Sequence, residues 1–202
     1  MMTSRARPIL LSMTLLALMF FLGGCSPVWH GQQAQARIPG LAEAGQVYTL
    51  TNLHPDEPRH FLWAANFVRG GLIPVCSPVT IVKMSPKSAW FRLESTGVVY
   101  RYYNHRTNPR PLQEHLSLVL GPECPQAELA SMSETDKRHI ANGTLGLGMS
   151  RKGVIVALGY PTEKHTPDLK ADTWKYWRSR ARSFDVTFGS DGLVTAGEIP
   201  QL

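Results

Sequence analysis

Three cysteines, Cys25, Cys76 and Cys124, carry the most reactive side chains of this 202-residue chain. A thiol can be acylated or can form a disulfide, and a thiolate can act as a nucleophile. Neither Cys76 nor Cys124 belongs to a Cys-x-x-Cys pair or has a histidine close by in the sequence. The pattern therefore disfavours a catalytic cysteine and favours lipid attachment or disulfide formation.

The residues before Cys25 have the three-part layout of an export signal. Arg5 and Arg7 precede an apolar run over residues 9–21, which is too short to span a bilayer and is typical of a signal h-region. The Leu22-Gly23-Gly24-Cys25 sequence resembles the bacterial lipobox, which implies cleavage before Cys25 and lipid on its sulfur and amine. Two or three acyl chains would anchor the chain stably. The alternative is an ordinary signal peptide, residues 1–24, with a chance cysteine at the cleavage site.

Localisation and charge narrow the class of partner. Ser26 stands where an aspartate tends to retain enterobacterial lipoproteins at the inner membrane, so the resemblance implies an outer-membrane lipoprotein, expected to face the periplasm. The net charge is +6, of which two positive charges belong to the signal, leaving +4 on the mature chain. A mild basic excess suits anionic lipid head groups or acidic sugars. We do not expect nucleic acid as a partner of a tethered envelope protein.

The two remaining cysteines are expected to bond to each other. An exported chain meets an oxidising compartment, where a disulfide between Cys76 and Cys124 is the default interpretation. Two free, buried thiols are the alternative, since sequence alone does not show that the two residues meet in space.

The fold class expected from the patterning is α+β, with a mostly-β first module over residues 46–121. Residues 25–45, rich in Gln, Gly and small side chains, predict a flexible tether in which Trp29 and His30 either rest in the head-group layer or are simply exposed. Period-2 alternation predicts strands at 47–50, 78–84, 88–94 and 97–103, and a helix is expected over 111–120. Short strands at this spacing indicate a small barrel or curled antiparallel sheet.

A linker over residues 122–133 leads to the expected second module, residues 134–202. A short helix is predicted over 134–141, and a second helix is predicted to start at the N-cap Ser150 and to end before Gly159 and Pro161. Strands are expected at 173–178, 183–188 and 193–199, the last two joined at Asp191-Gly192.

The second module resembles the SmpA/OmlA domain family, whose fold is that of the BamE subunit of the outer-membrane β-barrel assembly machine. The motifs that carry this resemblance are Gly148-Met149-Ser150, Leu158-Gly159-Tyr160-Pro161, Trp174-Lys175-Tyr176 and the stretch from Phe184 to Val194. They cover about 65 residues in the family's order and spacing. The resemblance implies a compact BamE-like unit of two helices and three strands, used for protein contacts in the periplasm.

Other spacings that could support chemistry do not reach a recognisable site. Gly143, Gly146 and Gly148 precede a helix without the Lys-Ser/Thr of a phosphate loop, so they are expected to be turn residues. The polar segment with His54, Asp56 and His60 favours a solvated loop over a metal site. Gly-x-Ser-x-Gly and His-Glu-x-x-His are absent from the sequence. We therefore expect no enzymatic activity, no cofactor and no bound metal.

The most promising contact surface lies at the expected turn between two strands of the second module. It comprises Lys175, Trp177, Arg178, Arg180 and Arg182, with Trp177 expected to be exposed. We expect this surface to bind an envelope protein, in a role connected with outer-membrane assembly or integrity. Binding of anionic lipid or glycan by the same hairpin and the barrel face is the alternative, and a solvated hairpin tip is the simplest interpretation.

Overall fold

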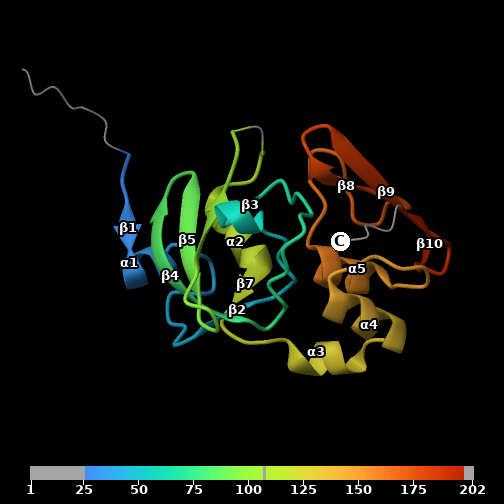
Figure 1. Ribbon diagram of the computed structural model, residues 1–202, viewed down its shortest axis with the longest axis horizontal. Helices are drawn as coiled ribbons and strands as arrows, with labels where there is room; N and C mark the ends of the chain where they lie inside the picture. The colour runs from blue at the N-terminus through green and yellow to red at the C-terminus, as the bar shows by residue number, and fades with distance from the viewer. Residues whose placement is uncertain (1–25, 107, 198–202) are drawn as a thin grey trace, which may run out of the picture.

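The computed structural model describes residues 26–106 and 108–197, so Cys25 and the end of the last expected strand lie outside the described residues. The chain folds into a curled, mostly-β part and a smaller α+β part, which lie side by side (Figure 1). Each part has its own apolar core. The expected α+β class and its two-module order are confirmed, and within the described residues no helix is long and apolar enough to cross a membrane.

The first sheet has the strand order β3-β6-β5-β4-β2-β7, and β1 adds to the same side of β4 as β2. All pairs are antiparallel except β3 with β6, which is parallel and was not expected. The strands are β1 Trp29–His30, β2 Val47–Thr49, β3 Phe61–Trp63, β4 Pro78–Ser85, β5 Ser88–Leu93, β6 Val99–Tyr103 and β7 Leu120–Gly121. A 3-10 turn, η1, spans Glu57–Arg59 before β3.

Side chains along β4, β5 and β6 alternate between apolar and polar, so the apolar ones gather on one face of the sheet, which is buried. Helix α2, Leu112–Val119, covers that face and contributes Leu112, Leu116 and Val119 at helical spacing. Phe91 and Tyr102 project from β5 and β6 into the same core. The opposite face keeps its side chains half-exposed, so the residues that can meet a ligand lie there.

The expected flexible tether over residues 25–45 is wrong for most of its length. After β1, the helix α1 spans Gly31–Gln35, and Ala34, Ile38 and Leu41 are buried in the first core. The Gln35 side chain donates from Nε2 to the carbonyls of Leu41 at 2.9 Å and Ala44 at 2.7 Å. The segment is polar in composition, but its three apolar residues pack against the sheet as part of the first core.

The expected linker is also structured. It contains the helix α3, Gln126–Ser131. The disulfide between Cys76 and Cys124 is present, with its Cα atoms 4.9 Å apart, and ties the linker to the first module. The start of the connection between the modules is therefore fixed to the first module.

The second module has the two helices and three strands expected of it. These are α4 Glu134–Asn142, α5 Arg151–Leu158, β8 Thr173–Ser179, β9 Arg182–Phe188 and β10 Val194–Gly197, with the antiparallel order β10-β9-β8. Ser150 caps α5, since its Oγ accepts from the amide of Gly153 at 2.9 Å. Asp136 accepts from the amide and the hydroxyl of Ser150, which fixes the start of α5 against α4.

Candidate functional site

The two modules are joined by three polar side chains of the first module that reach backbone carbonyls at the C-terminal ends of α4 and α5. Asn52 donates to the carbonyl of Ile140 at 2.6 Å and, at 3.3 Å, to that of Ala157. His54 donates from Nε2 to the same Ala157 carbonyl at 2.8 Å, and Asn66 donates to the carbonyls of Leu158 and Tyr160. The last carbonyls of a helix have no partner within it, so this junction latch, Asn52, His54 and Asn66, satisfies them from another module.

The expected solvated loop around His54 is therefore wrong for its first residues. Asn52 and His54 are buried, and burial lowers the pKa of His54 below its ordinary value, with the ring held neutral. Asp56 instead lies near Arg59 and Arg69, and His60 is exposed. Among residues 26–106 and 108–197, no group of three His, Cys, Asp or Glu side chains is placed to hold a metal ion.

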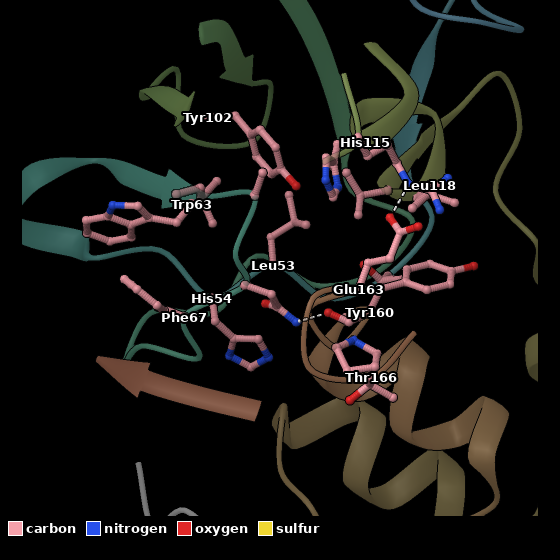
Figure 2. Close-up of a pocket in the computed structure, with 18 of the residues that line it drawn as sticks. Leu53, His54, Trp63, Phe67, Tyr102, His115, Leu118, Tyr160, Glu163 and Thr166 are labelled. Atoms are coloured by element: carbon pink, nitrogen blue, oxygen red, sulfur yellow. Dashed lines mark hydrogen bonds and ion pairs between the residues drawn. The ribbon is translucent and has the colours of Figure 1, made fainter. Parts of the chain in front are cut away.

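A small cavity of about 150 Å³, with both polar and apolar side chains in its walls, lies beside the latch. Figure 2 shows Trp63 and Phe67 on one side of it and His115 and Glu163 on the other. Arg110 pairs with Glu163 at 3.2 Å, which adds an ion pair across the junction. Burial, together with the nearby Arg110 charge, lowers the pKa of His115 to about 4. Among the described residues that line this cavity there are charged groups but no nucleophile hydrogen-bonded to a base.

A larger cleft of about 440 Å³ opens at the surface of the same junction. Its size is within the range of roughly 300–1,000 Å³ typical of ligand sites. Both modules line it, through Trp63, Ala65, Phe67, Tyr103, His105, Asn108, Thr162, Lys164, His165, Trp177 and Arg180. We call this the junction cleft. Its walls are aromatic and its charged side chains are basic, since no carboxylate of the described residues lines it.

The aromatic walls of the junction cleft are held by ring contacts within each module. Trp63 and Phe67 have ring centroids 5.3 Å apart, and His165 lies 5.2 Å from Trp177. The backbone connects the two walls, because the amide of Val68 donates to the carbonyl of Trp177 at 2.8 Å. The cleft therefore lies over a backbone contact between the two modules, the isolated parallel bridge of Phe67 with Trp177.

The structure separates the five residues of the predicted contact surface. Trp177 and Arg180 line the junction cleft, with Trp177 half-buried rather than exposed as expected. Lys175 lies elsewhere, paired with Asp185 at 2.6 Å. Arg178 is half-buried and Arg182 is exposed on β9, and neither lines the cleft.

Sequence reasoning missed the half of the cleft that comes from the first module. Trp63 and Tyr103 lie directly opposite each other on β3 and β6, on the outer face of the sheet. Their alternation with the buried Leu62 and Tyr102 was a usable signal, since residues two apart share a face. What the sequence did not contain was the pairing of Phe67 with Trp177, 110 positions later in the chain.

No protein-family model, curated protein or solved structure matches this chain.

Proposed function

We propose that this chain is a non-enzymatic envelope lipoprotein, held on the outer membrane through Cys25, that binds a protein partner at the junction cleft. The observation that supports this proposal is the composition of the cleft: Trp63, Phe67, Tyr103 and Trp177 with Arg180 at the edge. Aromatic residues and arginine are the types enriched in protein interfaces and in their energetic hot spots. A role in outer-membrane assembly or integrity fits this location and remains part of the proposal.

The fold supports binding by a rigid surface rather than by a mobile loop. The latch and the Arg110–Glu163 ion pair hold the two cleft walls together, and the disulfide ties the linker between the modules to the first of them. A preformed site loses less conformational entropy when its partner binds. The cleft has room for one or two anchoring side chains of a partner, with the remaining interface spreading over the surrounding surface.

Site-specific photo-cross-linking in living cells tests the protein-binding role. A photoreactive amino acid replaces Tyr103 or Trp177 in the cleft, and the exposed Arg138 on α4 serves as the control position. We expect both cleft positions to capture one and the same envelope protein that the control does not capture. Trp177→Ala should weaken capture from position 103 by about 30-fold or more, the effect of a hot-spot loss of about 2 kcal/mol. Equal labelling at all three positions would reject the proposal.

Acyl labelling tests the anchor separately. The native chain should incorporate a fatty-acid analogue, and Cys25→Ser should abolish incorporation while leaving the disulfide intact. A native chain that stays unlabelled would remove the lipoprotein part of the proposal.

The basic hairpin supports binding of anionic lipid or glycan as the second candidate. Arg180 and Arg182 lie at the turn between β8 and β9 and are exposed, and Arg178 precedes them. Co-sedimentation with peptidoglycan or lipopolysaccharide, before and after changing all three to alanine, tests it. Undiminished sedimentation of the triple variant would reject this surface.

A further inference from the structure

A row of side chains crosses the outer face of the first sheet from β1 to β3. Strand register places His30 opposite Lys83, Lys83 opposite Trp90, Trp90 opposite Arg101, and Arg101 opposite Phe61. Residues directly paired on neighbouring strands project from the same face. The residues next to them in sequence that point to the other face are buried, namely Met84, Ala89, Tyr102 and Leu62. We call His30, Lys83, Trp90, Arg101 and Phe61 the outer row.

Basic and aromatic side chains alternate along the outer row. Lys83 Nζ lies 4.6 Å from the centre of the Trp90 ring, and Arg101 Cζ lies 5.2 Å from the same ring. Arg101 also donates to the Ser88 hydroxyl at 3.0 Å. In the described part of the chain, Lys83 and Arg101 form no ion pair with a carboxylate. Their charges are therefore held in place by neutral groups and keep their attraction for an external anion.

The outer row begins next to the expected lipid anchor. Only residues 26–28 separate Cys25 from β1, and four residue steps span at most about 14 Å when fully extended. Trp29 is fixed to β4 opposite Met84, and Arg37 lies over the Trp29 ring at 3.7 Å. Figure 1 shows β1 and α1 at the end of the molecule away from α4 and α5. Lipid on Cys25 would therefore bring this end of the sheet to the membrane surface.

We propose that the outer row docks on anionic phospholipid head groups of the membrane that holds the chain. This goes beyond the protein-binding role and rests on the proposed lipid anchor for its location. Lys83 and Arg101 supply the charge attraction to lipid phosphates, and Trp90, between them, has the amphipathic ring that favours the head-group layer. Docking fixes the orientation of the body on the membrane, which a single anchor point leaves free to rotate.

Vesicle co-sedimentation tests the outer row without the anchor. The protein is the mature chain with Cys25→Ser, which keeps every described residue. It is mixed with vesicles of phosphatidylglycerol and phosphatidylcholine, or of phosphatidylcholine alone. We expect binding to the anionic vesicles only, weakened by salt. A basic residue near an anionic surface contributes about 1 kcal/mol, or about fivefold, so Lys83→Gln with Arg101→Gln should lower the partition coefficient by about 25-fold.

A matched control removes two charges from the second module. Arg138→Gln with Lys170→Gln changes two exposed residues by the same net charge and should leave partition nearly unchanged. Because Arg101 contacts Ser88, a second test uses Lys83→Glu alone, with an unaltered melting temperature as evidence of folding. Equal loss of partition in the outer-row and control variants would show a general charge effect and overturn the proposal, as would equal binding to neutral vesicles.

The outcome is separable from that of the proposed function. If Cys25 of the native chain is acylated and the cleft captures its partner, but the outer-row variants bind vesicles normally, the docking proposal alone fails. If the outer-row variants lose vesicle binding while Cys25 stays unlabelled, the anchor fails and the lipid-binding face stands.

Discussion

Asn52 is the residue of the junction latch whose loss should be most damaging to stability. Its side chain is 1% exposed, donates to the Ile140 carbonyl at 2.6 Å and accepts from the Val75 amide at 2.8 Å. Asn52→Ala leaves the Val75 amide without its partner inside the protein, which costs about 1–3 kcal/mol, and it also removes the Asn52 hydrogen bonds to the carbonyls of Ile140 and Ala157, worth about 1 kcal/mol each. We expect a loss of about 3–4 kcal/mol, a large part of the roughly 5–15 kcal/mol that stabilises a typical domain.

Urea denaturation followed by tryptophan fluorescence and circular dichroism measures this loss. The control is Asn142→Ala, which removes an exposed side chain that donates to the Arg138 carbonyl at the end of α4. That change should stay within about 0.5 kcal/mol, as surface substitutions usually do. A decrease below about 1 kcal/mol for Asn52→Ala, with an unchanged denaturant slope, would refute the latch as a stabilising contact. Separate unfolding transitions for the two cores would show in addition that the latch couples them.

Three further predictions concern the disulfide, acid stability and the start of α5. The double variant Cys76→Ser with Cys124→Ser should lose about 4 kcal/mol of unfolding free energy, the value of the chain-entropy model for a separation of 48 residues. The melting temperature of the native chain should fall when reductant is added, and that of the double variant should not change. The folded-state pKa of His54 is lowered, and that of His115 is lowered to about 4, below the ordinary 6.5. The two neutral rings therefore contribute their full stabilisation above pH 6.5, and this contribution is lost as the pH falls toward 4. The urea midpoints measured at pH 7.5, 6 and 5 should decrease in that order, and the decrease should be smaller in His115→Gln. Ser150→Ala should cost about 1–2 kcal/mol, because it removes the N-cap of α5, and Ser150→Thr should restore most of the stability.

The elements that the sequence predicted well have local causes. The alternation of β4, β5 and β6 and the turns between them are properties of neighbouring residues, so their bounds were expected within a few residues. The same holds for α5, whose Ser150 cap and following Gly159 are adjacent to the helix. These features need no knowledge of which other segment covers them.

The parts that sequence reasoning missed depend on contacts between distant segments. Asn52 and Asn66 have the composition of a surface loop, and the burial of Asn52 and partial burial of Asn66 follow from carbonyls that lie about 90 positions later on α4 and α5. Ala34, Ile38 and Leu41 have helical spacing, but Pro39 and Gly40 interrupt this segment and disfavour a helix. The three side chains become buried only because they pack against a sheet that forms from later strands. The junction cleft was missed for the same reason, since Trp63 and Trp177 meet only after both modules have docked.

The folded segment that follows Cys25 changes what the proposed lipid anchor implies about the orientation of the rest of the molecule. A flexible segment of some twenty residues would let the body sample many orientations, whereas β1 fixes it within a few residues of Cys25. The segment from Phe61 to Phe67 then connects every surface of interest: Phe61 ends the outer row, Trp63 and Phe67 form one cleft wall, and Asn66 belongs to the latch. Because Trp63 and Tyr103 share the face of Phe61 and Arg101, a body oriented by the outer row would hold the junction cleft in a fixed position close to the membrane surface. In this arrangement the lipid and the sheet position the protein, and the latch keeps the cleft in the shape that a partner has to fit.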